Sequence, residues 1–190
     1  MSISEINIST ERLELRGLIL SDTKALYKYR TMPEIYKFQG WKPQSLEEVE
    51  NFIGEQISKL PNIPDTWYQL GVIKKGTVEL IGDIGLHFIS KDDKQAEIGY
   101  TLDPAYQGLG YGTEAVIGVI NYLFNTLKKH RIMASIEPSN IKSIALLERI
   151  GMRREAHFKK SIWLHDKCED DIIYAMLEEE FIIEEVNRNL

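Results

Sequence analysis

The sequence predicts one domain of the α/β class, in which helices flank a mixed sheet. Segments with the period-two alternation of strands and segments with the apolar stripe of helices follow one another along all 190 residues. A glycine-rich segment, Gln107–Gly112, connects a strand pattern to the most apolar helix pattern. No linker, repeat or low-complexity stretch divides the chain, so we expect residues 1–190 to form a single domain.

The first part of the chain is expected to form a strand and two helices. Arg12-Leu13-Glu14-Leu15-Arg16 alternates charge and leucine, which predicts a half-buried strand. Ser21-Asp22 offers an N-cap to a first helix, and Pro33 breaks that helix. Ser45-Leu46-Glu47-Glu48 is a capping box that begins a second helix, which Pro61 ends.

The middle of the chain is expected to form three strands. The β-rich runs Trp67–Ile73 and Val78–Leu86 are joined at Lys75-Gly76, which predicts an antiparallel hairpin. Ala96–Leu102 is a further strand pattern, and Asp103-Pro104 closes it. The glycine-rich segment follows directly.

The second half of the chain mixes both kinds of element and ends in a helical tail. A helix over Asn140–Arg149 is expected to end at Gly151, because glycine favours the position just after a helix. The other expected elements are a helix over Thr113–Lys129, a short strand over Ile132–Glu137, a hairpin of Lys160–Leu164 and Asp171–Leu177 around His165-Asp166-Lys167, and a helical tail over Glu178–Asn189.

Composition excludes several classes of function. A net charge of −6 argues against a nucleic-acid binder, because phosphate contacts require clustered Lys and Arg. The single cysteine, Cys168, excludes a disulfide framework and a cysteine-based zinc site, and it fits a cytoplasmic location. The four histidines lack metal-ligand spacing, so no metal is expected. Residues 1–10 show no signal peptide, and no apolar run reaches the ~20 residues that span a bilayer, so no membrane partner is expected.

Three glycines spaced two apart form the most informative motif. Gly108, Gly110 and Gly112 lie between a strand and a helix start, where several backbone N–H groups can point at one anion. The helix dipole adds positive charge there, so a pyrophosphate can be held without a lysine. A flexible strand-to-helix turn is the alternative. The G-x-G-x-x-G dinucleotide fingerprint and the P-loop are both excluded by the spacing.

Gln107-x-x-Gly110-x-Gly112 resembles the (Arg/Gln)-x-x-Gly-x-(Gly/Ala) signature of GCN5-related N-acetyltransferases, the GNAT family. Glu97–Leu102 resembles the family's fourth strand, and Asn140–Ser143 together with Arg149–Met152 resembles its second motif. Two other segments, Thr10–Arg16 and Glu169–Tyr174, resemble the subgroup of ribosomal-protein alanine and serine N-acetyltransferases. The resemblance covers almost the whole chain.

This resemblance implies a GNAT fold, with a mostly antiparallel twisted sheet that splays between its fourth and fifth strands. It also implies acetyl-CoA as co-substrate, with a backbone N–H near Leu102 holding the oxyanion. Main-chain groups of Tyr100, Thr101 and Leu102 would bond the pantetheine arm, which Asn140 also contacts, and those of Gln107, Gly108, Leu109, Gly110, Tyr111, Gly112 and Thr113 would bond the pyrophosphate.

Direct attack by the acceptor requires a neutral amine, so the reaction requires a base. Glu97 is the first candidate, because it lies on the strand expected to carry the thioester. A solvated strand glutamate is the alternative. Asp83 on the preceding strand is a weaker candidate, because an exposed polar position in a hairpin is the commoner explanation. His87 is the one histidine considered for the cleft.

The leaving thiolate is the other chemical requirement. Many family members have a tyrosine seven residues after the motif asparagine, and here that position is Leu147. Ser143 lies one helical turn after Asn140 and is the candidate to hydrogen-bond the sulfur. A polar surface position is the alternative for Ser143, and a simple N-cap is the alternative for Asn140.

The sequence leaves the acceptor open. Tyr36, Phe38 and Trp41 fall where family members line the acceptor pocket, although core packing also explains them. The resemblance favours a protein N-terminal α-amine. A small amine (a polyamine, an aminoglycoside or an amino-acid derivative) is the alternative, followed by a non-catalytic acyl-CoA-binding module. An apolar face on the C-terminal helix, through Phe181, Ile182 and Val186, would permit a homodimer beside the monomer.

Overall fold

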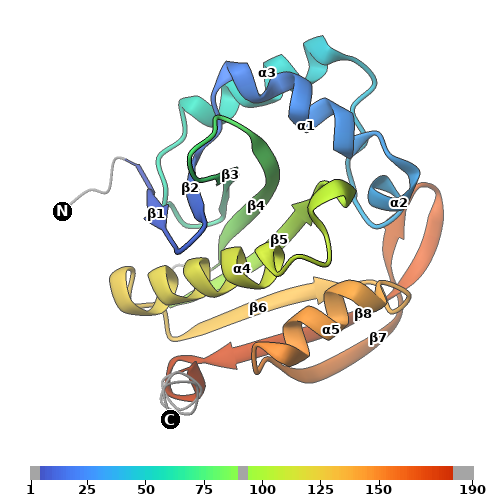
Figure 1. Ribbon diagram of the computed structural model, residues 1–190. Helices are drawn as coiled ribbons and strands as arrows, with labels where there is room; N and C mark the ends of the chain where they lie inside the picture. Colours follow the sequence, from blue (N-terminus) through green and yellow to red (C-terminus); the bar gives the residue numbers. More distant parts are fainter. Residues whose placement is uncertain (1–4, 90–93, 182–190) are drawn as a thin grey trace.

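The computed structural model describes residues 5–89 and 94–181 and contains one eight-stranded sheet with helices on both faces (Figure 1). The strand order is β1-β2-β3-β4-β5-β6-β8-β7. The strands are β1 (Ile8–Ser9), β2 (Leu13–Gly17), β3 (Thr66–Lys74), β4 (Leu80–Ile89), β5 (Gln95–Leu102), β6 (Arg131–Ile136), β7 (Arg153–Leu164) and β8 (Lys167–Leu177). The helices are α1 (Thr23–Arg30), α2 (Pro33–Tyr36), α3 (Leu46–Ile57), α4 (Tyr111–Asn121) and α5 (Ile141–Arg149).

The sheet is antiparallel except between β5 and β6. These two strands are parallel, and their pairing covers only Gln95–Arg131, Ala96–Ile132 and Glu97–Met133. Beyond Glu97 the strands diverge, and β6 continues along β8 while β5 continues along β4 (Figure 1). The rest of β5 therefore has an edge that faces an opening in the sheet. This arrangement confirms the predicted fold class, including the splay between the two strands.

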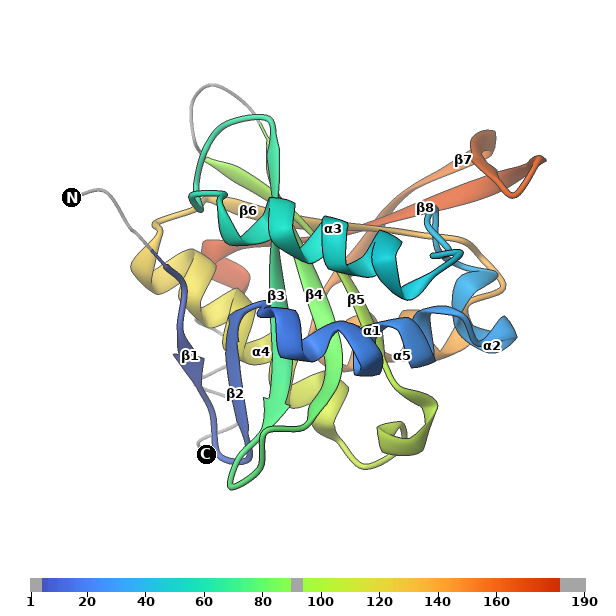
Figure 2. The same ribbon diagram turned by 90° about the horizontal axis from the view of Figure 1, so that it is seen from above.

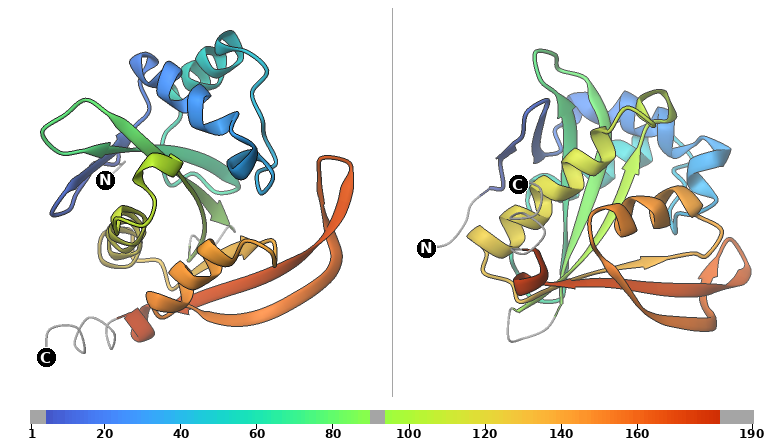
Figure 3. Two further views of the ribbon diagram at one scale, coloured as in Figure 1. Left: turned by 45° about the vertical axis from the view of Figure 1, so that its right-hand side comes forward. Right: turned by 60° about the horizontal axis from the view of Figure 1, so that its bottom comes forward.

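Two apolar clusters lie on opposite faces of the sheet. Helices α1 and α3 cover one face through a smaller cluster that includes Leu26, Val49 and Ile53 (Figure 2). Helices α4 and α5 cover the other face through the main core, which includes Val116 and Leu147 (Figure 3). Because side chains alternate along a strand, Ile98 points to the main core while Glu97 and Gly99 point to the face of α1 and α3.

Local chemistry explains where several elements begin. Ser45 caps α3 by accepting from the backbone N–H of Glu48, as the capping box predicts. The second hydrogen bond of a capping box, from the backbone N–H of Ser45 to the Glu48 carboxylate, is replaced here. The Glu48 carboxylate instead accepts from Gln44 N and from Trp41 Nε1. Asn140 caps α5 through Ser143 N.

Some boundaries differ from those predicted. Pro33 begins α2 at its first turn, where its missing N–H costs nothing, so it does not simply break the first helix. Asp22 does not cap α1 with its side chain, because its carboxylate accepts from Ile19 N and from the guanidinium of Arg16. Helix α4 ends at Asn121 and a π-helical turn, Tyr122–Thr126, follows it.

The C-terminal region differs most. The final hairpin is longer than predicted, because β7 begins at Arg153 and is an edge strand whose exposed charged residues carry no apolar alternation. Residues 178–181 are helical, but Phe181 is only 2% exposed and packs on Phe124, with the ring centroids 5.6 Å apart. Phe181 therefore belongs to the core and does not form an exposed dimer face. Ile182 and Val186 lie outside the described residues.

Candidate functional site

The glycine-rich loop forms the turn between β5 and α4. Gly108 and Gly110 have φ angles of 76° and 83°, in the left-handed region that glycine enters without a Cβ penalty. Gly110 is the N-cap of α4, and its carbonyl accepts from Glu114 N at 3.0 Å. The backbone N–H groups of Tyr111, Gly112 and Thr113 precede that first bond, so the helix leaves them available to an anion.

Side chains brace this loop from both sides. Gln107 Nε2 donates to Leu102 O at 3.0 Å, and Gln107 Oε1 accepts from Lys142 Nζ at 2.9 Å. Arg12 Nη1 donates to Leu109 O at 3.0 Å. The loop is thus tied to the end of β5, to α5 and to the start of β2. The backbone N–H of Gln107 donates to Pro104 O at 3.2 Å, so Gln107 supports the loop through its side chain and does not offer a free main-chain N–H to the pyrophosphate.

The loop also has more cationic neighbours than the sequence interpretation expected. Lys142 contacts Gln107, and Arg149 Nη1 donates to Thr113 Oγ1 at 3.3 Å. Glu114 lies in the first turn of α4, but Arg12 pairs with it at 2.6 Å. Burial would raise the pKa of Glu114, yet hydrogen bonds from Thr10 and Arg12 hold that pKa below its ordinary value. The charge of this carboxylate is therefore balanced within the protein, and Lys142 and Arg149 leave the loop surface positive.

A coenzyme A pyrophosphate fits these residues. A Cβ on Gly110 would lie 3.1 Å from Arg12 Nη2, and one on Gly112 would lie 3.2 Å from Leu146 Cδ1. Side chains at these positions would crowd the cradle. The diverging edge of β5, which carries Tyr100, Thr101 and Leu102, leads directly to the loop and offers main-chain groups for an extended amide chain.

Tyr100 spans the opening between β5 and α5. Its hydroxyl donates to Ser143 O at 3.1 Å, and burial raises the pKa of this tyrosine. Ser143 itself is half-buried in the first turn of α5. Leu147 is fully buried in the main core. The helix position that carries a tyrosine in many family members therefore serves packing in this chain.

Glu97 lies beside His87 on the face of the sheet that carries α1 and α3. The two residues are direct partners across β4 and β5, and His87 Nδ1 lies 3.3 Å from Glu97 Oε2. Their side chains are 26% and 23% exposed, so solvent and an acceptor can reach both. Trp67 on β3 stacks on His87. The sequence placed Glu97 on a strand and His87 just after the preceding strand pattern, Val78–Leu86, and gave no register that would pair them.

Next along this face is a pair of glycines. Gly85 and Gly99 are direct partners across β4 and β5, in the position between Glu97 and Thr101. Gly99 is exposed, and a Cβ on it would meet no atom within 4 Å. The space beside Glu97 is therefore open above the backbone.

Asp83 follows on the same face and has a different role from the one considered. The residue is fully buried, not exposed. Its carboxylate accepts from Tyr29 Oη at 2.6 Å and also from Arg30 and Gln69. Burial and Asp83 raise the pKa of Tyr29 well above its ordinary value, and Asp83 raises the pKa of Arg30 against the effect of burial. Asp83 is the buried counter-ion that fixes α1 on the sheet, so it is unavailable as a base.

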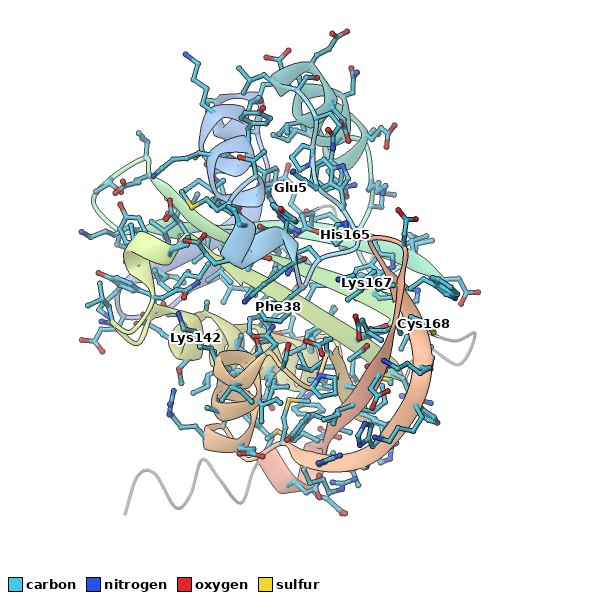
Figure 4. The ribbon with its side chains drawn as sticks, turned by 90° about the vertical axis from the view of Figure 1, so that its right-hand side faces the viewer. Glu5, Phe38, Lys142, His165, Lys167 and Cys168 are labelled. Atoms are coloured by element: carbon cyan, nitrogen blue, oxygen red, sulfur yellow. The ribbon has the colours of Figure 1, made fainter. Side chains whose placement is uncertain are left out.

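The aromatic residues proposed for the acceptor pocket divide into two groups. Trp41 packs on Phe52 of α3, with ring centroids 4.6 Å apart, and belongs to the smaller cluster. Tyr36 accepts through its backbone carbonyl from His165 Nε2 at 2.8 Å. This contact joins the end of α2 to the turn of the β7–β8 hairpin. Figure 4 shows His165 at that turn and Phe38 in the segment that follows α2.

Other classes of site receive no support from the described part of the chain. Within residues 5–89 and 94–181, no group of three or more His, Cys, Asp or Glu side chains is arranged to hold a metal ion. Over the same ranges, no helix is long and apolar enough to cross a membrane.

Comparisons with known proteins agree with this geometry. Residues 12–153 match the acetyltransferase (GNAT) domain family. The chain is 32% identical over 176 residues to the uncharacterised N-acetyltransferase YnaD of Bacillus subtilis (strain 168), covering 93% of this chain and 99% of that protein. It is 28% identical over 173 residues to the ribosomal-protein-serine acetyltransferase of Escherichia coli (strain K12), covering 88% and 94%. The crystal structure of a GNAT-family acetyltransferase from Bacillus anthracis matches with a TM-score of 0.83 at 32% identity, covering 92% and 100%.

Proposed function

This chain belongs to the acetyltransferase (GNAT) family and is an acetyl-CoA-dependent N-acetyltransferase, and from that premise we propose that its acceptor is the α-amine of a protein N-terminus. The observation that carries the proposal is the open backbone at Gly99, beside Glu97 on the same strand. Gly99 projects no side chain above the sheet, so a peptide end can lie flat on the backbone there. The 28% identity to the ribosomal-protein-serine acetyltransferase adds support, and a ribosomal target would require the enzyme to act in the cytoplasm.

The charge around this face favours a peptide over a polycation. A polyamine site needs several unpaired carboxylates. Among the described residues, Asp83 is paired with Arg30, Asp103 with Lys28 and Asp170 with Lys159. Asp171 on β8 has no cation partner among the described residues, but it is buried and accepts from Ser135 Oγ at 2.7 Å. The Glu97 side chain is 23% exposed, and its one contact in that part of the chain, to His87, leaves an oxygen for an incoming ammonium. A single exposed carboxylate suits an acceptor with a single amine.

For the donor, we place the pyrophosphate of acetyl-CoA on the main chain of Gly108, Leu109, Gly110, Tyr111, Gly112 and Thr113. The N–H of Gln107 donates to Pro104 O, so Gln107 supports the loop through its side chain. The pantetheine arm would run along Tyr100, Thr101 and Leu102 and end beside Asn140 and Ser143. The splay of β5 from β6 and the left-handed glycines support this placement. This placement brings the thioester to the edge of β5 next to Gly99, which lies two positions after Glu97 on the same strand.

The chemistry then needs few groups. Glu97 takes one proton from the acceptor ammonium, directly or through a water. The amine lone pair forms the C–N bond and the C–S bond breaks, while a backbone N–H near Leu102 stabilises the oxyanion. The amine nitrogen loses a second proton as the amide forms, and the departing CoA thiolate takes up this proton. Ser143 at the start of α5 would donate a hydrogen bond to the sulfur, since Leu147 is buried in the core.

A direct test measures free thiol release from acetyl-CoA with a panel of acceptors. The panel contains peptides with free N-terminal serine or alanine, the same peptides with a blocked N-terminus and an internal lysine, spermidine, an aminoglycoside and a free amino acid. We expect turnover with the free N-terminal peptides and none with the blocked ones. Mass spectrometry of the product locates the acetyl group.

Two results would contradict the proposal. Faster turnover of spermidine or another small amine than of every peptide would assign the acceptor to that class. Equal turnover of blocked and free peptides would move the reaction to the lysine ε-amine. Either result would leave the donor assignment intact, because that part depends on the loop and on β5.

A further inference from the structure

Three residues form a row across the sheet at the end of the acceptor face. Trp67 of β3 is the direct partner of His87 of β4, and His87 is the direct partner of Glu97 of β5. Directly opposed residues in a sheet project from the same face with adjacent side chains. Trp67, His87 and Glu97 are therefore neighbours in space although 30 positions separate the first from the last in the numbering.

The contacts within this row are specific. The Trp67 and His87 rings are stacked, with centroids 4.8 Å apart and an interplanar angle of 6°. His87 Nδ1 lies 3.3 Å from Glu97 Oε2. The stack fixes the plane of the imidazole ring, and the ring edge then meets one carboxylate oxygen. Within the described residues this is the one hydrogen bond recorded for the Glu97 carboxylate, so Oε1 remains for another partner.

We propose that His87 is a positioning residue for Glu97, and that Trp67 holds His87 in the plane that this task requires. His87 donates its Nδ1 proton to Oε2 of Glu97 and orients the carboxylate so that Oε1 faces the acceptor amine above Gly99. The inference rests on the proposed function, because it requires Glu97 to be the base. It adds His87 as the residue that orients the base, and Trp67 as the residue that orients His87.

The alternative is a packing role, in which His87 merely fills the surface between Trp67 and Glu97. Two substitutions separate these roles. His87→Phe keeps a flat ring for stacking on Trp67 but removes the donor, and His87→Asn keeps an N–H donor near the Nδ1 position but removes most of the stack. Positioning predicts that kcat falls about tenfold in His87→Phe and less than about threefold in His87→Asn. A packing role predicts the reverse order.

A double-mutant cycle with Glu97→Gln tests whether His87 acts through Glu97. We expect His87→Phe to change kcat less than about twofold when Glu97 is already Gln, because there is no base left to position. The assay uses the acceptor of the panel that the enzyme turns over fastest. Acetyl-CoA affinity, measured by isothermal titration calorimetry, should stay within about twofold in every variant, since no member of the row touches the glycine loop.

A spectroscopic readout makes the test independent of the acceptor. In ¹⁵N-labelled protein, the imidazole signals that disappear in His87→Phe belong to His87, and they should report the tautomer with the proton on Nδ1. Glu97→Ala should shift this ring toward the Nε2-protonated tautomer of a free imidazole. An unchanged tautomer would overturn the proposed hydrogen bond.

The kinetic outcomes keep the two proposals apart. If Glu97→Gln abolishes turnover while His87→Phe is fully active, Glu97 remains the base and the positioning role of His87 is wrong. A tenfold loss from His87→Phe in both backgrounds would also contradict the positioning role, because His87 would then act independently of Glu97. If Glu97→Gln retains wild-type kcat, the base assignment fails and the positioning role fails with it.

Discussion

The donor side and the acceptor side that we propose for this enzyme are built from different parts of the chain. The donor side is mainly backbone: two left-handed glycines, the first N–H groups of α4 and the free edge of β5. The acceptor side is side chains on one face of the sheet, with the row of Trp67, His87 and Glu97 at one end and the buried Asp83 at the other. Backbone recognition depends on spacing and glycine, so the sequence alone reveals the donor and leaves the acceptor open.

The largest expected effect breaks the donor side. Gly110→Trp or Gly112→Trp should reduce acetyl-CoA affinity by about 1,000-fold or more, because a bulky side chain fills the anion cradle and Gly110 has a φ of 83° that such a residue adopts only with strain. Isothermal titration calorimetry measures the loss, and circular dichroism checks the fold. Gly54→Trp is the matched control, because a Cβ on Gly54 meets no atom within 4 Å. Normal acetyl-CoA binding by either loop variant would refute the assignment.

The next effect concerns the support of the acceptor side. Arg30→Met leaves the Asp83 carboxylate buried without its cation, and breaking a buried pair in this way costs about 3–5 kcal/mol of stability. Urea denaturation should show the loss, while acetyl-CoA affinity of the folded protein should be unchanged. Lys159→Gln, which breaks the exposed pair with Asp170, is the control and should destabilise far less. A small change in Arg30→Met would mean that the hydrogen bond from Tyr29 to Asp83 and the apolar contacts of α1 suffice to hold this helix on the sheet.

A third effect separates the two sides by kinetics. Glu97→Gln should lower kcat by about 100-fold, the usual contribution of a positioned base, with acetyl-CoA affinity within about twofold of wild type. Glu50→Gln on the exposed side of α3 removes the same charge far from the site and should leave both quantities unchanged. If the Glu97 variant instead loses acetyl-CoA affinity, Glu97 belongs to the donor side and another group must be the base.

The sequence predicted most of the fold and the position of the glycine-rich loop between β5 and α4, because these depend on local patterns. Strand β2 was predicted from alternation, and β3 and β4 from β-rich runs joined at Lys75-Gly76. The starts of α3 and α5 were indicated by their capping residues Ser45 and Asn140. The charge-rich edge strand β7 lacked that signal, so its start at Arg153 was missed.

Long-range pairing explains what the sequence did not reveal at the site. Asp83 was considered an exposed residue because nothing local shows that Tyr29 and Arg30, over 50 positions earlier, enclose it. The contact of His87 with Glu97 depends on strand register, which a hairpin pattern does not fix by itself. Lys142 and Arg149 were missed for a similar reason, because α5 reaches the loop only in three dimensions.

The smallest expected effect tests whether the donor side is purely backbone. Lys142→Gln and Arg149→Gln should each weaken acetyl-CoA binding by about two- to fivefold, since both cations are exposed and solvent screens them. The loss should shrink in 1 M KCl, where the Debye length falls to about 3 Å. Isothermal titration at low and high salt measures both quantities.

Lys24→Gln is the matched control for this last prediction. Lys24 is exposed on α1, on the opposite face of the sheet from α4 and α5, so its loss changes the net charge equally without approaching the loop. An equal loss of affinity in all three variants would assign the effect to the overall charge of the protein. A loss confined to Lys142 and Arg149 would show that side chains from α5 assist the backbone in holding the phosphates. No change in any of them would make the donor side a backbone site throughout, and would sharpen its contrast with the acceptor face.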